Sequence, residues 1–175
     1  MDGMMECDLI LQAQNGNTEA MNRLIIHYYP MVFAFFYRNT NQYHQSKDLT
    51  QEVFIKMVVA ISKYRPQSKF KSWLFTIASN HLKNYYRSRS RHPEPAELEE
   101  NIPASFDEAE EIAVRNDIRD ALLELPREQK EVIILHYYQE FSFREIAEIT
   151  GENESTLKAR ARYGLNKLRS KWGGS

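Results

Sequence analysis

Three prolines and a run of acidic side chains interrupt an otherwise helical chain between residues 89 and 111. The prolines are Pro93, Pro95 and Pro103, and residues 93–114 contain 8 acidic residues and no lysine or arginine. Proline cannot donate a backbone hydrogen bond, and like charges repel one another, so this composition favours an extended, mobile connection. The chain is therefore expected to fold as two small domains, residues 1–92 and 112–175, joined by a flexible acidic linker at 93–111.

On both sides of this linker, apolar residues recur at helical spacing and strand signals are nearly absent. Pro30 should kink or break one helix near Tyr29, and Ser142 with Glu145 forms the capping-box pattern that opens another. The predicted fold class is all-α. The expected helices cover 6–14, 18 onwards, 46–61, 70–87, 112–125, 126–138, 142–149, and from 154 or 155 to the last basic residues.

The net charge of −1 hides a strong segregation of charge along the sequence. Residues 1–92 hold 12 basic against 6 acidic residues, and residues 155–175 hold 6 basic residues and no acid. Basic ends around an acidic middle favour two nucleic-acid-binding faces, the alternative being ordinary solvated surface charge. The single cysteine, Cys7, excludes a disulfide within the chain and fits a reducing cytoplasm. The sequence has no apolar run long enough for membrane insertion and no signal-peptide pattern, so we expect a cytoplasmic protein.

Asp48 and Glu52 are the only acidic residues between positions 20 and 93. Being four residues apart, they share one face of a helix, which we interpret as a docking surface for a protein. Paired carboxylates can also serve acid–base catalysis, but neither a histidine nor a third acid accompanies them within the motif. The five histidines are scattered and no phosphate-binding glycine loop exists, so we expect no catalytic residue, no metal and no cofactor.

Aromatic and basic side chains alternate between residues 64 and 91, as in proteins that bind single-stranded DNA. Tyr64 lies in a loop beside Pro66, where we expect an exposed ring. Asn80 and Asn84 are one helical turn apart and can hydrogen-bond a base edge. Phe70, Trp73 and Leu74 are better explained as core residues.

The last two predicted helices have the layout of a helix-turn-helix, a short helix followed by a glycine turn and a basic helix. Lys158, Arg162 and Tyr163 fall on the outer face, where they can reach base edges or phosphates. Ser155, Thr156 and the backbone amides beside them suit a phosphate. The alternative is a small helical hairpin with a solvated basic face.

Five motifs in order resemble the extracytoplasmic-function (ECF) sigma factors of bacterial RNA polymerase. They are Asp48-Leu-Thr-Gln-Glu-Val-Phe54, Phe70-Lys-Ser-Trp-Leu-Phe-Thr-Ile-Ala-Ser-Asn80, Leu125-Pro-Arg-Glu-Gln-Lys-Glu-Val-Ile-Ile-Leu135, Phe141-Ser-Phe-Arg-Glu-Ile-Ala147 and Ser155-Thr-Leu-Lys-Ala-Arg160. The resemblance spans residues 6 to about 169. It implies a transcription initiation factor that performs no chemistry. It also implies three partners, which are core RNA polymerase, promoter DNA and an anti-sigma factor.

The resemblance assigns a role to each group of candidate residues. The set implied to bind core polymerase is Asp48, Leu49, Gln51, Glu52 and Phe54. The set implied to read and open the −10 element is Tyr64, Arg65, Lys69, Lys71, Ile77, Asn80, Asn84 and Arg87. The set implied to read the −35 element is Arg144, Ser155, Thr156, Lys158, Arg160, Arg162 and Tyr163. The acidic linker is implied to thread the RNA exit path.

Two positions depart from the family pattern, because Tyr163 stands where an arginine is common and Ala159 where a small hydroxyl residue is common. The contact that members of this family usually make with a guanine of the −35 element is then absent or supplied by Arg162. A stand-alone helix-turn-helix regulator explains residues 126–169 equally well, but not the acid-poor first half. An adaptor or anti-sigma-like protein would need no basic recognition helix.

Overall fold

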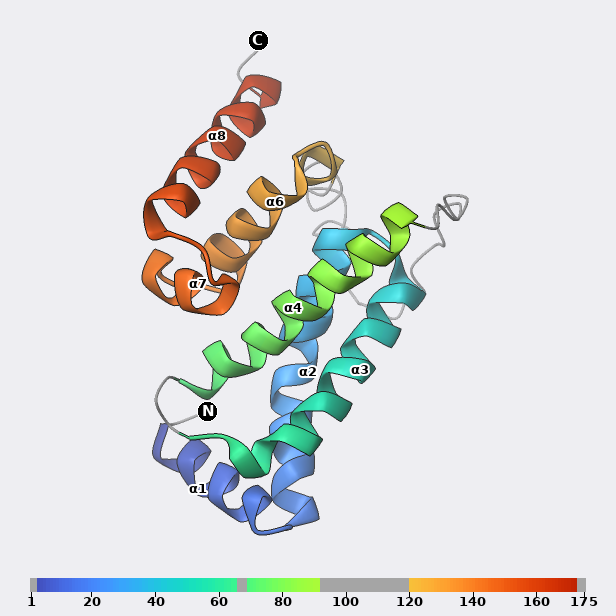
Figure 1. Ribbon diagram of the computed structural model, residues 1–175, viewed down its shortest axis with the longest axis vertical. Coiled ribbons are helices and arrows are strands. Elements are labelled where there is room, and N and C mark those ends of the chain that lie inside the picture. The colour runs from blue at the N-terminus through green and yellow to red at the C-terminus, as the bar shows by residue number, and fades with distance from the viewer. Residues whose placement is uncertain (1–2, 66–68, 92–119, 173–175) are drawn as a thin grey trace.

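The computed structural model describes residues 3–65, 69–91 and 120–172, and every regular element in these ranges is a helix (Figure 1). The all-α prediction is confirmed for this part of the chain. The predicted linker at 93–111 lies outside the described residues. The first unit contains α1 (Gly3–Gln14), α2 (Thr18–Thr40), α3 (Tyr43–Ala60), a 3₁₀ turn (Ile61–Lys63) and α4 (Phe70–Arg91).

The second unit begins, where it is described, with a helical turn at 120–123, the end of the helix predicted over 112–125. The helix predicted over 126–138 is α6 (Arg127–Ile133), followed by one π-helical turn (Ile134–Tyr138). The helix-turn-helix consists of α7 (Phe143–Thr150) and α8 (Glu154–Trp172). The predicted capping box is present, because Ser142 Oγ accepts from the Glu145 amide and the Glu145 side chain accepts from the Ser142 amide.

Pro30 does not break α2, which runs as one helix from Thr18 to Thr40, so the prediction of a break is wrong. Pro30 is exposed, and so is Ile26, the residue whose carbonyl oxygen loses its helical hydrogen bond. The opposite face of α2 is buried along its whole length, from Leu24 through Val32 to Phe36. Burial of this apolar face outweighs the loss of one hydrogen bond.

A single hydrophobic core joins the two units, a feature that the sequence did not predict. The helix α4 packs against α3 on one side and against α7 on the other, and in Figure 1 it lies between the two units. Phe75 is central to this core, with its ring centroid 5.6 Å from Phe35 and 5.1 Å from Phe141. The two units therefore pack as one body.

Candidate functional site

The predicted docking face lies on α3, where Asp48, Gln51 and Glu52 are exposed as expected. Ile55 and Val59 continue the same stripe and are 64% and 74% exposed. Ile55 and Val59 were not among the residues predicted for this face, although they lie three and seven residues after Glu52, at helical spacing. Exposed aliphatic groups beside carboxylates are typical of a surface that binds another protein.

Leu49 and Phe54, also predicted to bind a partner, are buried in the core of the first unit. The Phe54 ring stacks on Tyr29 with centroids 5.9 Å apart. The prediction that these two side chains form part of the contact surface is therefore corrected. Leu49 and Phe54 fall on the inner side of the helix, where they fix the orientation of the exposed face.

Glu52 also contacts the neighbouring helix α4 through a histidine. Its Oε2 lies 2.9 Å from His81 Nε2, and Lys56 Nζ lies 2.7 Å from His81 Nδ1. Burial and the adjacent Lys56 charge lower the pKa of His81, an effect that outweighs the opposing influence of Glu52. The imidazole is therefore neutral at pH 7 and accepts from Lys56, and the docking face is linked to the helix that carries the candidate DNA-binding residues.

One face of α4 presents the predicted base-reading residues to solvent. Asn80, Asn84 and Arg87 are exposed, and Ile77 is half-buried beside them. Their spacing of three and four residues aligns all four along one side of the helix. The structure thus brings together two amides, a cation and an aliphatic group, as the sequence predicted.

Tyr64 is only 6% exposed, so the prediction of an exposed ring is wrong. Its ring centroid lies 5.4 Å from Phe70 and 4.9 Å from Trp73. The physical reason is a contact from α1, because Gln14 Nε2 donates to both the Ile61 and the Tyr64 carbonyl oxygens at 2.9 Å. Gln14 holds this turn against α1, and no local pattern in the sequence predicts a contact between residues so far apart.

Replacing Gln14 by alanine should lower the free energy of unfolding by about 1–2 kcal/mol, because two half-buried hydrogen bonds are lost. Thermal unfolding should show a fall in Tm of about 2–8 °C. Gln12→Ala is the matched control, since Gln12 is exposed on the same helix. Equal melting temperatures for Gln14→Ala and the wild type would show that these hydrogen bonds do not hold the turn.

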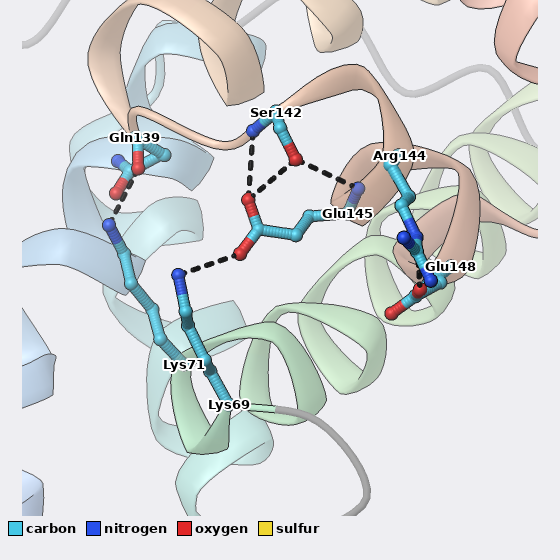
Figure 2. Close-up of polar contacts among 7 residues, drawn as sticks. All are labelled: Lys69, Lys71, Gln139, Ser142, Arg144, Glu145 and Glu148. Carbon is cyan, nitrogen blue, oxygen red and sulfur yellow. Dashed lines mark hydrogen bonds and ion pairs between the residues drawn. The ribbon is translucent and has the colours of Figure 1, made fainter.

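Lys69 and Lys71, at the start of α4, contact the second unit (Figure 2). Lys69 Nζ lies 3.2 Å from Glu145 Oε1, and Lys71 Nζ donates to the Gln139 carbonyl oxygen at 2.6 Å. Burial lowers the pKa of Lys71, although the nearby Glu140 and Glu145 oppose that shift. Both cations were predicted to bind DNA, but here they bind the C-terminal part of the chain.

The outer face of α8 carries the predicted duplex-binding residues. Thr156, Lys158, Arg162 and Tyr163 are exposed, and the Arg162 guanidinium lies 5.3 Å from the centre of the Tyr163 ring. Ser155 donates to Asn153 Oδ1 at 2.6 Å, so its hydroxyl takes part in the start of the helix. Lys158 and Arg162 also line an open groove. Its lining residues are Tyr137, Phe143, Lys158, Ala161, Arg162, Leu165, Asn166 and Arg169.

Three predicted duplex-binding cations are paired with acidic side chains of their own unit. The pairs are Arg144 with Glu148 at 3.8 Å, Lys158 with Glu154 at 2.6 Å and Arg160 with Glu152 at 2.5 Å. The Arg144 and Lys158 pairs are exposed, and such pairs contribute about 0–1 kcal/mol, so a phosphate can replace the acid. Arg160 has the least exposed side chain of the three, so it is the least available for the predicted contact with DNA.

Within the described ranges, no cluster of three or more histidine, cysteine, aspartate or glutamate side chains could hold a metal ion. No described helix is both long and apolar enough to cross a membrane. The described part of the chain presents an acidic and aliphatic face on α3, an amide-rich face on α4 and a basic face on α8.

Two sigma-factor family models match the chain in the same order as these surfaces. Sigma-70 region 2 matches residues 24–92, which include the α3 and α4 faces, and Sigma-70 region 4 matches residues 115–168, which include the helix-turn-helix. The chain is an ECF sigma factor of the sigma-70 family. This sigma factor therefore acts in transcription initiation, by directing RNA polymerase to promoters.

Curated relatives support the same assignment over nearly the whole sigma factor. It is 30% identical to RNA polymerase sigma factor YlaC of Bacillus subtilis, over 87% of this chain and 94% of YlaC. It is 29% identical to the ECF sigma factor SigW of the same organism, over 95% of this chain and 96% of SigW. These relatives favour the sigma-factor assignment over a stand-alone helix-turn-helix regulator.

Two solved structures share the fold of this chain. The sigma factor RpoE of Bartonella quintana, solved in complex with the anti-sigma factor NepR, matches with a TM-score of 0.74 and 25% identity, covering 88% of this chain and 97% of RpoE. CnrH, solved in complex with the cytosolic domain of CnrY, matches with a TM-score of 0.72 and 22% identity, covering 98% of this chain and 99% of CnrH. The match to CnrH bears on the fold alone.

Proposed function

We propose that residues 1–92 of this sigma factor bind core RNA polymerase and open the −10 element, while residues 112–175 read the −35 element. The observation that carries this proposal is the separation of three chemically distinct surfaces on α3, α4 and α8. An acidic and aliphatic face suits a protein partner. Amides suit unpaired bases, and a basic helix suits duplex DNA.

The polymerase-binding surface consists of Asp48, Gln51, Glu52, Ile55 and Val59. The carboxylates orient the polymerase on this surface and raise the association rate. The exposed aliphatic side chains supply the apolar area that is buried on binding. Leu49 and Phe54 hold this surface in place from the core side.

In the −10 region, Asn80 and Asn84 would hydrogen-bond bases taken out of the stack, with Ile77 beside them as an apolar contact. Arg87 and Arg65 are exposed and suit the phosphate backbone. Tyr64 supports the turn before α4 and its ring is packed on Phe70 and Trp73, so it contributes through the position of the turn.

Replacing both Asn80 and Asn84 by alanine should reduce promoter opening by about tenfold or more on duplex templates, since recognition of an extruded base must offset an unstacking cost of a few kcal/mol. Pre-melted −10 templates should be affected far less. Permanganate reactivity of thymines near the start site reports opening directly. Asn22→Ala removes an exposed amide from α2 and serves as the control. Equal opening of duplex templates by the double variant and the wild type would exclude this face.

Arg162 is the best-placed base reader on α8, because it is exposed and lies beside Tyr163, where the family often has arginine. Arg162→Ala should change the preferred −35 sequence, at a cost of about 1–3 kcal/mol for the preferred site. Selection from a promoter library measures the change, and Lys167→Ala, on the same helix, is the control. An unchanged −35 preference in Arg162→Ala would assign base reading to another residue.

We also propose that the chain has no catalytic role of its own and works in the cytoplasm, where its polymerase partner is. An anti-sigma factor is a further proposed partner. The support is that RpoE, a similar sigma factor, was solved in complex with the anti-sigma factor NepR.

A further inference from the structure

His81 of α4 lies between two charged side chains of α3. Its Nε2 is 2.9 Å from Glu52 Oε2, and its Nδ1 is 2.7 Å from Lys56 Nζ. An acid and a lysine four residues apart on a helix often pair directly with each other. Here each of them contacts the imidazole, so a buried side chain of α4 acts on both charges.

The contact with Lys56 fixes which nitrogen of His81 carries the proton. A lysine ammonium group can only donate a hydrogen bond, so Nδ1 of His81 accepts from it and is unprotonated. The proton of the neutral ring is then on Nε2, the nitrogen that faces Glu52. The ring thus joins a cation to an anion through its two nitrogens.

Glu52 is only weakly held by the neutral ring. Its side chain is 57% exposed, and Nε2 of His81 has no well-aligned hydrogen bond although Glu52 Oε2 is 2.9 Å away. An exposed, poorly aligned contact contributes little to stability, so the carboxylate can turn toward a cation of a partner. With His81 neutral, Glu52 therefore remains available on the docking face beside Asp48.

A second proton on His81 would change both contacts. Nδ1 would then carry a proton, which a lysine ammonium group cannot accept, so the exposed Lys56 side chain must move into solvent. The ring would also be a cation 2.9 Å from the Glu52 carboxylate, and a cation with little access to water attracts it far more strongly than a neutral ring does. Protonation therefore draws an acid away from the docking face and frees a base beside it.

The remaining neighbours of His81 carry no opposing charge to the ring. On α2 the neighbour is Phe36, with ring centroids 6.3 Å apart. The helices α6 and α7 contact the opposite side of α4, through Ser79 and Lys83. Residues two positions apart in a helix point in nearly opposite directions, so these contacts are separate from those of His81.

The surroundings of His81 also set the pH at which it charges. Burial and the adjacent Lys56 lower the pKa of His81 from its ordinary value of 6.5, and Glu52 opposes that shift. The ring is therefore neutral at pH 7 and takes up its second proton only at a pH below 6.5.

We propose that His81 is a positioning residue for polymerase docking: the neutral imidazole leaves Glu52 to the polymerase, and the protonated imidazole pairs with Glu52 and releases Lys56 onto the same face. This inference rests on the proposed function of the α3 face. Assembly with core polymerase is then linked to one proton, because binding favours neutral His81. The affinity should be steady above pH 6.5 and fall below it, by at most about tenfold per pH unit.

Titration of the labelled full chain with purified core RNA polymerase at pH 7.5 and pH 5.5 measures this linkage. The wild-type affinity should be about threefold or more lower at pH 5.5. His81→Gln keeps an acceptor for Lys56 and a donor for Glu52 but cannot be protonated. Its affinities at the two pH values should therefore agree within about twofold.

His27→Gln is the matched control for His81→Gln. The pKa of His27 is also lowered, chiefly by burial, but this ring lies on α2 against Tyr28, with centroids 4.8 Å apart. The variant should keep the wild-type ratio of affinities. Melting temperatures are measured at both pH values, because a histidine with a lowered pKa also costs stability as the pH falls below 6.5.

Two results would overturn the role of His81. One is the same ratio of affinities in the wild type and in His81→Gln. The other comes from the nitrogen chemical shifts of the labelled imidazole in the free chain, which should show the neutral ring protonated on Nε2. A neutral ring protonated on Nδ1 would contradict the contact with Lys56 on which the inference depends.

Asp48→Asn and Glu52→Gln distinguish an error about His81 from an error about the docking face. Both variants should bind polymerase more weakly at pH 7.5, and only Glu52→Gln should also lose the pH dependence, since Glu52 is the acid that meets His81. Wild-type affinity in both variants would show that the docking face is wrong. Weaker binding by both, with a wild-type pH ratio in His81→Gln, would show that only the role of His81 is wrong.

Discussion

Replacing Asp48 and Glu52 by lysine should weaken the binding of core RNA polymerase by about 100-fold or more, because two favourable charges become repulsive at a docking surface. The two carboxylates are exposed on one side of α3, together with Gln51 and the exposed aliphatic residues Ile55 and Val59. Titration of the labelled double variant with core polymerase measures the effect. Raising the salt concentration should weaken wild-type binding and narrow the difference.

Two controls separate docking from stability. Glu52→Lys also removes the contact with His81 and adds a charge near Lys56, so Asp48→Lys alone should be tested and the melting of each variant measured. Asp8→Lys with Glu19→Lys makes the same change in net charge at exposed sites on α1 and α2. Assembly of holoenzyme by the Asp48 and Glu52 variant with unchanged affinity would place the polymerase surface elsewhere.

Phe75→Ala should lower the free energy of unfolding by about 3–5 kcal/mol, the usual cost of deleting a buried aromatic side chain. Phe75 is 0% exposed and lies between Phe35 of the first unit and Phe141 of the second. The loss therefore weakens the core of the first unit and the contact between the units together. Chemical denaturation followed by circular dichroism measures the change.

Ile26→Ala is the control for Phe75→Ala, because Ile26 is largely exposed. Its replacement should lower the free energy of unfolding by no more than about 0.5 kcal/mol. A loss of under about 1 kcal/mol for Phe75→Ala would mean that the core closes around the missing ring. It would also mean that the contact between the two units contributes little to stability.

The helices and the helix-turn-helix could be predicted because their signals are local. Apolar spacing sets the buried face of each helix, and Ser142 with Glu145 forms the predicted capping box. Asp48 and Glu52 could be predicted to share one exposed helix face because they are isolated acids, four residues apart, in a basic segment. That Asn80 and Asn84 share one face of α4 could be predicted because they are one helical turn apart.

The remaining features depend on contacts between residues far apart in sequence. Gln14 fixes the turn at Tyr64 from 50 residues away, and that contact explains why the ring is buried. Gln139 reaches Met31 across 108 residues, and such pairs hold the two units together. Pro30 was predicted to kink or break α2, and the break is absent because the buried face of α2 decides the continuity of the helix.

The most direct test of the sigma-factor function is transcription by purified core RNA polymerase on a promoter library, with and without the chain. We expect initiation from a defined set of start sites only when both are present, with a shared −10 and −35 sequence upstream. Binding of the chain to duplex DNA without polymerase, combined with no initiation when polymerase is added, would contradict it.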